Sequence, residues 1–319
     1  MDILLSIVVP TLNRKDLLQT TLDELLQQIE QYKNVELIVS DNASNDGTHL
    51  LFENEKYSNS NLKYIRHETR VDIDQSFSRS VDLANGDFVT LFGDDDIAMP
   101  GYVGQVLKAI TENPNCGFVY VNRIICDEYL QNCNEIPHRD EIVGIHTMNV
   151  SDFIKRFTHW PGFVTCLIFS MKVWNEKQKL NYIYPGYNFL YRVYMGSMGL
   201  KVCYIANPLI AQRRGIQSWK KFWPQYWLIS MPHLLKTLED DNVTKGALKV
   251  WQDTEITNKR FLIDSFVAKA YSYPIKSDFW KLSRSFQFSK LRKVISYFIQ
   301  YFLPTTLAKY IYSKSKKMT

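Results

Sequence analysis

Three features typical of membrane, secreted and zinc-binding proteins are missing from this sequence. Its five cysteines form no CxxC pair and are odd in number, so we expect buried thiols in a reducing compartment, and neither a disulfide framework nor a zinc site. No run of about 18 apolar residues occurs, so we expect no transmembrane helix. The apolar start carries Asp2 where a signal peptide would be basic and is cut short by Pro10, which indicates a buried strand.

Two common nucleotide-binding motifs are also missing. No GxGxxG follows the first apolar segment, and GxxxxGK[ST] occurs nowhere, which excludes the usual dehydrogenase and P-loop patterns. The 319 residues are 45% hydrophobic and 22% charged, a composition that favours one large or two smaller folded domains over disorder. Any nucleotide site must therefore use other chemistry.

Acidic residues are absent from segment 281–319, which holds nine Lys and Arg, whereas the other 280 residues carry 29 basic and 33 acidic side chains. Within this tail, Lys290–Leu303 places its apolar residues on one helical face and basic and aromatic residues around it. This pattern is typical of a helix in a membrane interface. The alternatives are packing on the catalytic domain or a second subunit, as in a homo-oligomer. Nucleic acid is disfavoured because no recognition motif accompanies the basic residues.

Short apolar segments alternate with helical periodicity through the first third of the chain. We predict strands at Leu4–Thr11, Val35–Ser40, Leu62–Arg66 and Phe88–Phe92, and helices at Lys15–Tyr32, Thr48–Glu55, Ile73–Ala84 and Gly101–Thr111. Further strands are expected at Gly117–Val121, Phe163–Phe169 and Lys201–Ile205, with an irregular polar loop over Asn122–Thr147. The alternation predicts an α/β fold with a doubly wound, mostly parallel sheet.

The predicted domain organisation follows from where this alternation stops. The sheet domain covers residues 1–215. From residue 216 to 319 the periodicity is mostly helical, which indicates a separate helical region ending in the basic amphipathic tail.

Three adjacent carboxylates, Asp94, Asp95 and Asp96, follow the predicted strand Phe88–Phe92 directly after Gly93. Like charges this close repel, and burying one without a partner is costly. A divalent cation would remove the conflict, because Mg²⁺ and Mn²⁺ prefer carboxylates, waters and substrate phosphates. The other interpretation is an acidic turn or helix-capping cluster, since Asp is common in both.

Three motifs in order resemble the family 2 glycosyltransferases of GT-A fold. They are Ser6–Arg14, Glu36–Thr48 and Ala84–Phe88 leading into Asp94–Asp96. The resemblance is strong over residues 4–110 and fades by about residue 215. It implies that the sheet domain has a nucleotide-sugar half at 1–112 and an acceptor half at 113–215. The ending Gly-Asp-Asp-Asp is similar to enzymes of bacterial O-antigen and surface-polysaccharide assembly of the abequosyltransferase kind.

The resemblance implies a nucleotide-diphosphate sugar as donor and a divalent cation, Mn²⁺ or Mg²⁺. It places Pro10, Thr11 and Arg14 in the nucleotide pocket, Asp41 against the base, Asp94 on the ribose side, Asp95 as the main metal ligand, and Asp96 behind it or against the acceptor. The cation would stabilise the charge on the leaving diphosphate.

The sequence departs from the family at two places. Gly93 stands where many members carry the first acid, and Tyr184–Arg192 lacks the carboxylate that serves many inverting members as base. The base is therefore left open among Asp127, Glu128, Asp152 and His159. A retaining mechanism, or an acceptor activated without a protein carboxylate, also stays open. Arg213 and Arg214 are candidates for a diphosphate clamp, because arginine matches phosphate geometry, or are part of a solvated turn.

We therefore expect a glycosyltransferase that acts on a saccharide acceptor carried on a lipid, in the cytoplasm and peripheral on the membrane. One rival is a metal-dependent nucleotidyl- or phosphotransferase that uses the same acids. The other is a non-catalytic nucleotide-sugar-binding protein that kept the fold and lost the base.

Overall fold

The computed structural model describes residues 3–58, 61–137, 143–157, 163–176, 185–215, 222, 225–253, 267, 269–270 and 290–315. The chain divides into two compact units. The first unit comprises Met1–Phe153, Gly162–Tyr182 and Asn188–Ile216, and the second comprises Ile154–Pro161, Ile183–Tyr187 and Gln217–Thr319.

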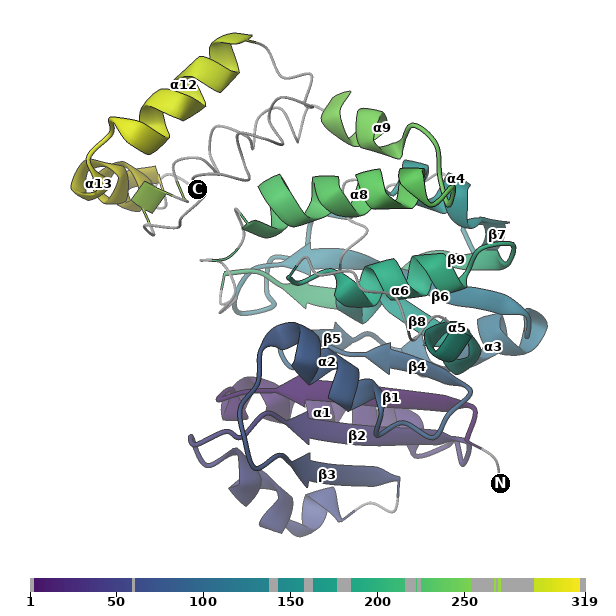
Figure 1. Ribbon diagram of the computed structural model, residues 1–319. Coiled ribbons are helices and arrows are strands. Elements are labelled where there is room, and N and C mark those ends of the chain that lie inside the picture. Colours follow the sequence, from purple (N-terminus) through teal and green to yellow (C-terminus); the bar gives the residue numbers. More distant parts are fainter. Residues whose placement is uncertain are drawn as a thin grey trace. The chain divides into compact units, whose positions relative to one another are not determined.

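Four parallel strands form the amino-terminal half of the sheet in the first unit, in the order β3-β2-β1-β4 (Figure 1). They are β1 (Leu5–Thr11), β2 (Val35–Asp41), β3 (Leu62–Arg66) and β4 (Phe88–Leu91). The register pairs Leu5 of β1 with Val35 of β2 on one side and with Phe88 of β4 on the other. β1 is thus the central strand. The chain adds β2 and β3 on one side of it and then crosses to add β4 on the other side, and open α/β sheets bind ligands at such a reversal of strand order.

The other half of the sheet is mixed and continues the order with β8-β6-β9-β5, while β7 also pairs with β9. These strands are β5 (Ile97–Ala98), β6 (Cys116–Cys126), β7 (Ile145–Asn149), β8 (Leu167–Ser170) and β9 (Lys201–Arg213). β8 is antiparallel to both β4 and β6, so β6 and its parallel neighbour β9 run in the same direction as β4. The carboxyl ends of β1, β2, β4, β6 and β9 consequently meet at one edge.

Helices cover both faces of this sheet, with α1 and α2 on opposite faces in Figure 1, as right-handed crossovers require. The helices are α1 (Lys15–Ile29), α2 (Ile73–Val81), α3 (Tyr102–Glu112), α4 (Val150–Arg156), α5 (Met171–Glu176) and α6 (Asn188–Gly196). Short turns of 3₁₀ helix occur at Thr48–Glu53, Glu55–Tyr57 and Val164–Cys166. Leu18, Leu22 and Leu25 of α1 are fully buried, which confirms the predicted apolar face.

Three of the predicted segments have wrong boundaries in the second half of the sheet. β6 runs on to Cys126 and β7 begins at Ile145, so regular structure enters both ends of the expected loop Asn122–Thr147. β9 continues past Pro208 to Arg213, because register shifts next to Asn122 accommodate a proline that has no N–H to donate. Likewise, the expected strand Phe163–Phe169 begins as a 3₁₀ turn and is extended only from Leu167.

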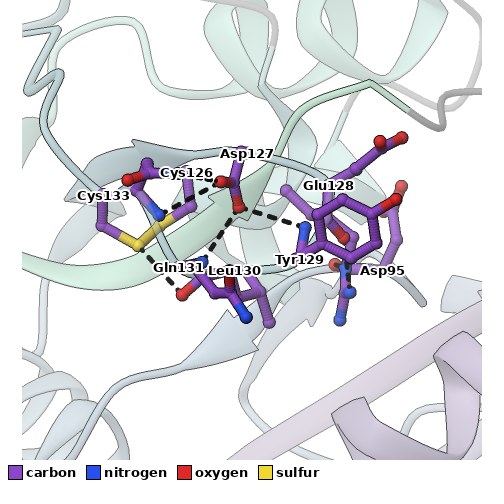
Figure 2. The surroundings of a disulfide bond; sticks show 10 residues. Asp95, Cys126, Asp127, Glu128, Tyr129, Leu130, Gln131 and Cys133 are labelled. Carbon is purple, nitrogen blue, oxygen red and sulfur yellow. Dashed lines mark hydrogen bonds between the residues drawn. A yellow bond between two sulfur atoms is a disulfide. The ribbon is translucent and has the colours of Figure 1, made fainter.

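The cysteine prediction needs a correction. Cys116, Cys166 and Cys203 are buried free thiols as expected, but Cys126 and Cys133 form a disulfide (Figure 2). β6 ends at Cys126, and the turn that follows folds back so that the two Cα atoms lie 4.0 Å apart. A spacing of seven residues has no signature in the sequence, so only the turn reveals the pair.

The second unit is helical where it is described. It contains the π-helical turn Tyr226–Ser230, α8 (Met231–Asp240), α9 (Ala247–Asp253), α12 (Lys290–Tyr301) and α13 (Thr305–Ser315). Trp227 and Trp251 are buried with ring centroids 5.8 Å apart and form part of its core. Within the described residues, no helix is long and apolar enough to cross a bilayer.

Candidate active site

The predicted acids lie at the carboxyl edge of the sheet and share one arginine. Arg14 follows β1, and its two Nη atoms lie 2.8 Å from Asp94 Oδ1 and 2.7 Å from Asp95 Oδ2. Thr11, the last residue of β1, donates its hydroxyl to Asp94 Oδ2 at 2.8 Å. Because β1 and β4 are adjacent and parallel, the two strand ends bring this cluster together as the sequence predicts.

The third acid is held differently. Asp96 Oδ2 accepts the Thr165 hydroxyl at 2.6 Å, and the Asp96 carbonyl accepts the Thr21 hydroxyl at 2.9 Å. A Cβ atom at Gly93 would lie 2.7 Å from Asp96 Oδ2 and 3.0 Å from Thr165 Oγ1. Gly93 therefore stands at this position because the Asp96 carboxylate folds back over it, leaving no room for a side chain.

The cluster carries more acidic than basic charge, because three carboxylates lie around the guanidinium of Arg14. All three carboxylates are buried. Burial raises the pKa of Asp94 to about 7, since the neighbouring Asp95 adds to the desolvation while Arg14 only partly opposes it. Burial and Asp95 also raise the pKa of Asp96 well above its usual range. Extra positive charge at this edge would stabilise the ionised acids.

Asp41, the last residue of β2, is completely buried and already has protein donors on both oxygens. Oδ1 accepts the Ser44 amide at 2.8 Å and Oδ2 accepts the Tyr64 hydroxyl at 2.7 Å. The Tyr64 ring stacks on Phe52 with centroids 3.9 Å apart. Each carboxylate oxygen can accept a further bond, so contact with a nucleotide base stays a prediction.

The loops after β1 and β2 interlock around this carboxylate. The Asn13 amide donates to Ser44 Oγ at 2.9 Å, and the Asn45 amide donates to Asn13 Oδ1 at 2.7 Å. Asn13 and Ala43 both adopt a left-handed backbone, with φ of 54° and 62°, a costly conformation that concentrates at functional sites. Pro10 lies within β1, paired with Ser40, so the predicted nucleotide loop begins just beyond it.

Both arginines of the predicted diphosphate clamp, Arg213 and Arg214, are bound to protein groups, and contact with a diphosphate stays a prediction. Arg213, at the end of β9, donates from Nε to the Asp95 carbonyl at 3.1 Å and from Nη1 to the Glu128 carbonyl at 3.0 Å. Arg214 forms an exposed ion pair with Glu135 at 2.9 Å. Both arginines therefore hold the segment after β6 in place, and Arg213 ties it to the loop of Asp95.

The four candidate bases occupy unlike places. Asp127 accepts the amides of three residues of its own turn, at 2.9–3.3 Å. Glu128 is exposed, and its backbone carbonyl accepts a bond from Arg213, which also bonds the Asp95 carbonyl. Asp152 lies in the first turn of α4, just after β7. The last residue of β7 pairs with the first residue of β9, and Arg213 stands at the other end of β9, roughly 40 Å away along the strand at about 3.3 Å per residue. His159 lies outside the described residues.

Several residues of this edge escape sequence reasoning because their partners are distant in the chain. Asp74 of α2 accepts the amide of Asn188, the first residue of α6, at 3.4 Å. Arg123 of β6 is fully buried, donates to Gln212 at 2.7 Å and acts electrostatically on Asp96. Arg123, a charged residue in the mostly apolar strand β6, could have been singled out by that contrast, whereas Asp74 is one of several polar residues of α2.

Comparison with known proteins decides the family. The family model "Glycosyl transferase family 2" matches residues 6–193, more than half of the chain. The chain belongs to glycosyl transferase family 2. The predicted family and enzyme class are thereby confirmed, and the protein is a glycosyltransferase.

Curated relatives of this family 2 glycosyltransferase include several bacterial glycosyltransferases. It is 26% identical over 237 residues to the abequosyltransferase RfbV of Salmonella typhimurium, covering 68% of this chain and 69% of RfbV. It is 30% identical over 118 residues to a GalNAc(5)-diNAcBac-PP-undecaprenol beta-1,3-glucosyltransferase of Campylobacter jejuni, covering 37% of this chain and 36% of that enzyme. It is also 35% identical over 97 residues to the amylovoran biosynthesis glycosyltransferase AmsB of Erwinia amylovora, covering 30% and 32%.

Solved structures confirm the predicted GT-A-like α/β fold of the transferase. TarS of S. aureus superposes with a TM-score of 0.60 at 14% identity, covering 98% of this chain and 92% of that one. The mannosyltransferase PcManGT of Pyrobaculum calidifontis, solved with GDP-Man and Mn²⁺, superposes with a TM-score of 0.56 at 15% identity, covering 97% and 87%. These likenesses establish the fold.

The carboxylates of Asp94 and Asp95 are of the chemical kind that Mg²⁺ and Mn²⁺ prefer, and both lie within 2.8 Å of the Arg14 guanidinium. Across the described part of the chain, no group of three or more acidic, histidine or cysteine side chains could hold a metal ion by itself. Mg²⁺ and Mn²⁺ also bind where one or two carboxylates share the ion with substrate phosphates, and Asp94 and Asp95 would be those carboxylates.

Proposed function

We propose that this family 2 glycosyltransferase moves a sugar from a nucleotide-diphosphate donor to a saccharide acceptor carried on a lipid, in the synthesis of a bacterial surface polysaccharide. The observation that carries the proposal is the convergence of Arg14, Asp94 and Asp95 on one sheet edge, one strand away from Asp41. Nucleotide sugars in related folds, UDP-GlcNAc on TarS and GDP-Man on PcManGT, support the donor class.

The interlocked loops after β1 and β2 are proposed to bind the nucleotide. Asp41 is held by Ser44 and Tyr64, and this fixed carboxylate would accept a hydrogen bond from the base. Thr11 and Arg14 restrain Asp94, so that it faces the ribose side of the donor. The rigidity of these partners limits the entropy lost on binding.

Asp95, with Asp94 beside it, would hold the divalent cation, and Asp96 would stay behind them on Thr165. When bound, the cation supplies positive charge to the leaving diphosphate. Arg14 already compensates part of the acidic charge, and we propose that it stays near both carboxylates and contributes to the same stabilisation. Asp95 thus has two roles, as a ligand and as an anchor of Arg14.

Glu128 is proposed as the carboxylate that activates the acceptor. The bond between the anomeric carbon and the diphosphate oxygen breaks, the acceptor oxygen bonds to that carbon, and its proton passes to Glu128. The products are the glycoside and the nucleoside diphosphate. Among the four candidates, the exposed Glu128 is favoured because Arg213 joins its backbone to that of Asp95, whereas Asp127 is engaged in its own turn.

An acceptor anchored in a lipid gives a reason for contact with a membrane. The relative from C. jejuni is named for an undecaprenol-linked acceptor. In the second unit, Val294 and Phe298 of α12 and Phe302 just after it expose 65%, 58% and 63% of their surface, and the tail around them is basic. We propose that α12 and α13 rest on the membrane that carries the acceptor.

A panel of UDP-, GDP-, CDP- and dTDP-sugars with Mn²⁺ tests the proposed function, with release of nucleoside diphosphate as the readout. We expect one donor class to be cleaved slowly by water and Asp95→Asn to weaken metal-dependent donor binding at least about tenfold, since a charged ligand is lost. The matched control is Asp87→Asn, which changes an exposed acid directly before β4, at the opposite end of that strand from Asp95.

The two rival functions predict different results in this panel. A nucleotidyltransferase would bind a free nucleoside triphosphate with a sugar phosphate and release pyrophosphate. A binding protein would take up the donor and never release nucleoside diphosphate, even with extracts that contain lipid-linked saccharides. Either outcome would refute the proposed transfer reaction.

A further inference from the structure

The segment Asp127–Asn132, here named the stapled turn, is fixed at both ends (Figure 2). The Cys126–Cys133 disulfide joins its two flanks. The Ile125 amide donates to the Glu135 carbonyl at 2.7 Å, and the Arg214 amide donates to the Cys126 carbonyl at 3.0 Å. The turn is therefore anchored to itself and to β9.

The interior of the stapled turn is ordered by one carboxylate. Asp127 Oδ1 accepts the amides of Tyr129 and Gln131 at 3.1 and 2.9 Å, and Oδ2 accepts the amide of Asn132 at 3.3 Å. These bonds, led by that from Gln131, hold the pKa of Asp127 below its usual value. An ionised acceptor with several amide donors fixes the path of the backbone.

This rigid turn holds a large aromatic side chain out in water. Tyr129 is 70% exposed, so its ring contributes little to the core. The Tyr129 hydroxyl bonds the neighbouring Glu128 carboxylate, which raises the pKa of Tyr129. An aromatic face beside a carboxylate suits a ligand with both apolar C–H faces and hydroxyl groups, because the ring packs on the former and the carboxylate accepts from the latter.

The stapled turn lies next to the acids of the active site. One guanidinium, that of the largely buried Arg213, binds both the Asp95 carbonyl and the Glu128 carbonyl. Figure 2 shows Glu128 and Tyr129 at the Asp95 end of the turn and the disulfide at the other end. A molecule stacked on Tyr129 would therefore sit within reach of a group transferred at Asp95.

We infer that Tyr129 and Glu128 form a subsite for a pyranose of the acceptor, with the ring of Tyr129 stacked on a sugar face and Glu128 accepting a sugar hydroxyl. The inference rests on the proposed function and deepens it by naming where the acceptor saccharide binds. The disulfide and Asp127 keep the ring in place before the saccharide arrives, which reduces the entropy cost of binding.

The test measures binding of a panel of methyl pyranosides to the full chain, by saturation-transfer NMR and by titration. We expect at least one pyranoside to bind, Tyr129→Ala to weaken it about tenfold through loss of the stacked apolar area, and Tyr129→Trp to retain it. Cys133→Ser should weaken it to a smaller extent. Met198→Ala removes an exposed side chain between α6 and the amino end of β9 and serves as the matched control.

Two results would overturn the subsite. They are pyranoside binding that is equal in the wild type and Tyr129→Ala, and a wild type that binds none of the pyranosides. Hydrolysis of the nucleotide sugar, measured on the same samples, separates this question from the proposed function. A donor cleaved at the wild-type rate by Tyr129→Ala, with pyranoside binding also unchanged, removes the subsite and leaves the transferase assignment intact.

Discussion

At the scale of single residues, Gly93 shows how a departure from a family pattern becomes a structural requirement. The point where its Cβ would stand is 2.7 Å from Asp96 Oδ2 and 3.3 Å from Asp95 Oδ1, so even alanine must displace a carboxylate. An acidic side chain here would add a further charge beside three acids, of which two, Asp94 and Asp95, already share Arg14. Both sterics and charge therefore favour glycine at this position.

We predict that Gly93→Ala lowers donor turnover at least about tenfold, because Asp96 loses its bond to Thr165 and moves toward Asp95. The measurement is release of nucleoside diphosphate at saturating donor. Gly104→Ala in α3 is the control, since its new methyl group meets only the end of the Tyr32 side chain. Equal turnover in Gly93→Ala and the wild type would show that the position of Asp96 is unimportant.

Sequence reasoning at this scale finds residues that sit in local motifs and misses those defined by distant partners. Arg14 and Asp94–Asp96 could be placed at one edge because parallel strands bring their ends together. The bond between Asp74 and Asn188 and the disulfide of Cys126 could not be placed, because each depends on how a separate loop or helix returns to the sheet. The spacing of residues along the chain does not show which loop or helix will come back to the sheet.

At the scale of elements, a single buried carboxylate joins the strands of the nucleotide half. Glu36 of β2 accepts the Ser6 hydroxyl of β1 at 2.6 Å, binds Lys63 of β3 at 2.8 Å, and accepts the Asn85 amide ahead of β4 at 2.7 Å. Burial by itself would raise the pKa of Glu36, but the bonds from Lys63, Ser6 and Asn85 together lower it below its usual value. The ionised side chain is thus the stabilising form.

The sign of this shift predicts how stability depends on pH. A lowered pKa in the folded state means that the contribution of Glu36 is present above the unfolded value of 4.5 and is lost as the pH falls through the folded value. We expect Glu36→Gln to lower the free energy of unfolding by roughly 1–3 kcal/mol at pH 7, since several buried partners lose a charged acceptor. The difference from the wild type should shrink below about pH 4.5.

Urea unfolding at several pH values measures this difference. Glu30→Gln, just beyond the exposed carboxyl end of α1, provides the control and should match the wild type throughout. A Glu36→Gln difference that stays constant from pH 7 to pH 3 would contradict the link between the strands and the ionised carboxylate. Sequence periodicity treats Val35–Asp41 as an apolar strand, so this polar link could be seen only once β1, β2 and β3 were placed side by side.

Boundaries of elements were predictable where the pattern was local and failed where pairing decided them. α1 and β3 end close to their predicted limits because apolar spacing defines both. β9 extends through Pro208, and its continuation to Arg213 depends on pairing with β6 and β5. The extension matters for function, because it delivers Arg213 to Asp95.

At the scale of the whole molecule, net positive charge and exposed apolar side chains are concentrated in the C-terminal segment. All the acids of the chain precede residue 281, while the segment after it holds nine basic residues. At the end of α12, the rings of Phe298 and of Phe302, the residue just after the helix, stack with centroids 5.4 Å apart and stay mostly exposed. A pair of adjacent exposed aromatic rings on a basic helix is suited to the headgroup region of an anionic bilayer.

We predict that the full chain sediments with vesicles of anionic phospholipid and that Phe298→Ser combined with Phe302→Ser reduces the bound fraction at least about fivefold, since two rings leave the bilayer. Val250→Ser on α9 removes another exposed apolar side chain, 40% exposed, and should bind like the wild type. Raising the salt concentration should weaken binding of both proteins, because attraction between basic residues and lipid is screened. Sedimentation of the double variant at the wild-type level would show that α12 does not contact lipid, and nucleotide-sugar hydrolysis by that variant at the wild-type rate would confirm that its catalytic unit is intact.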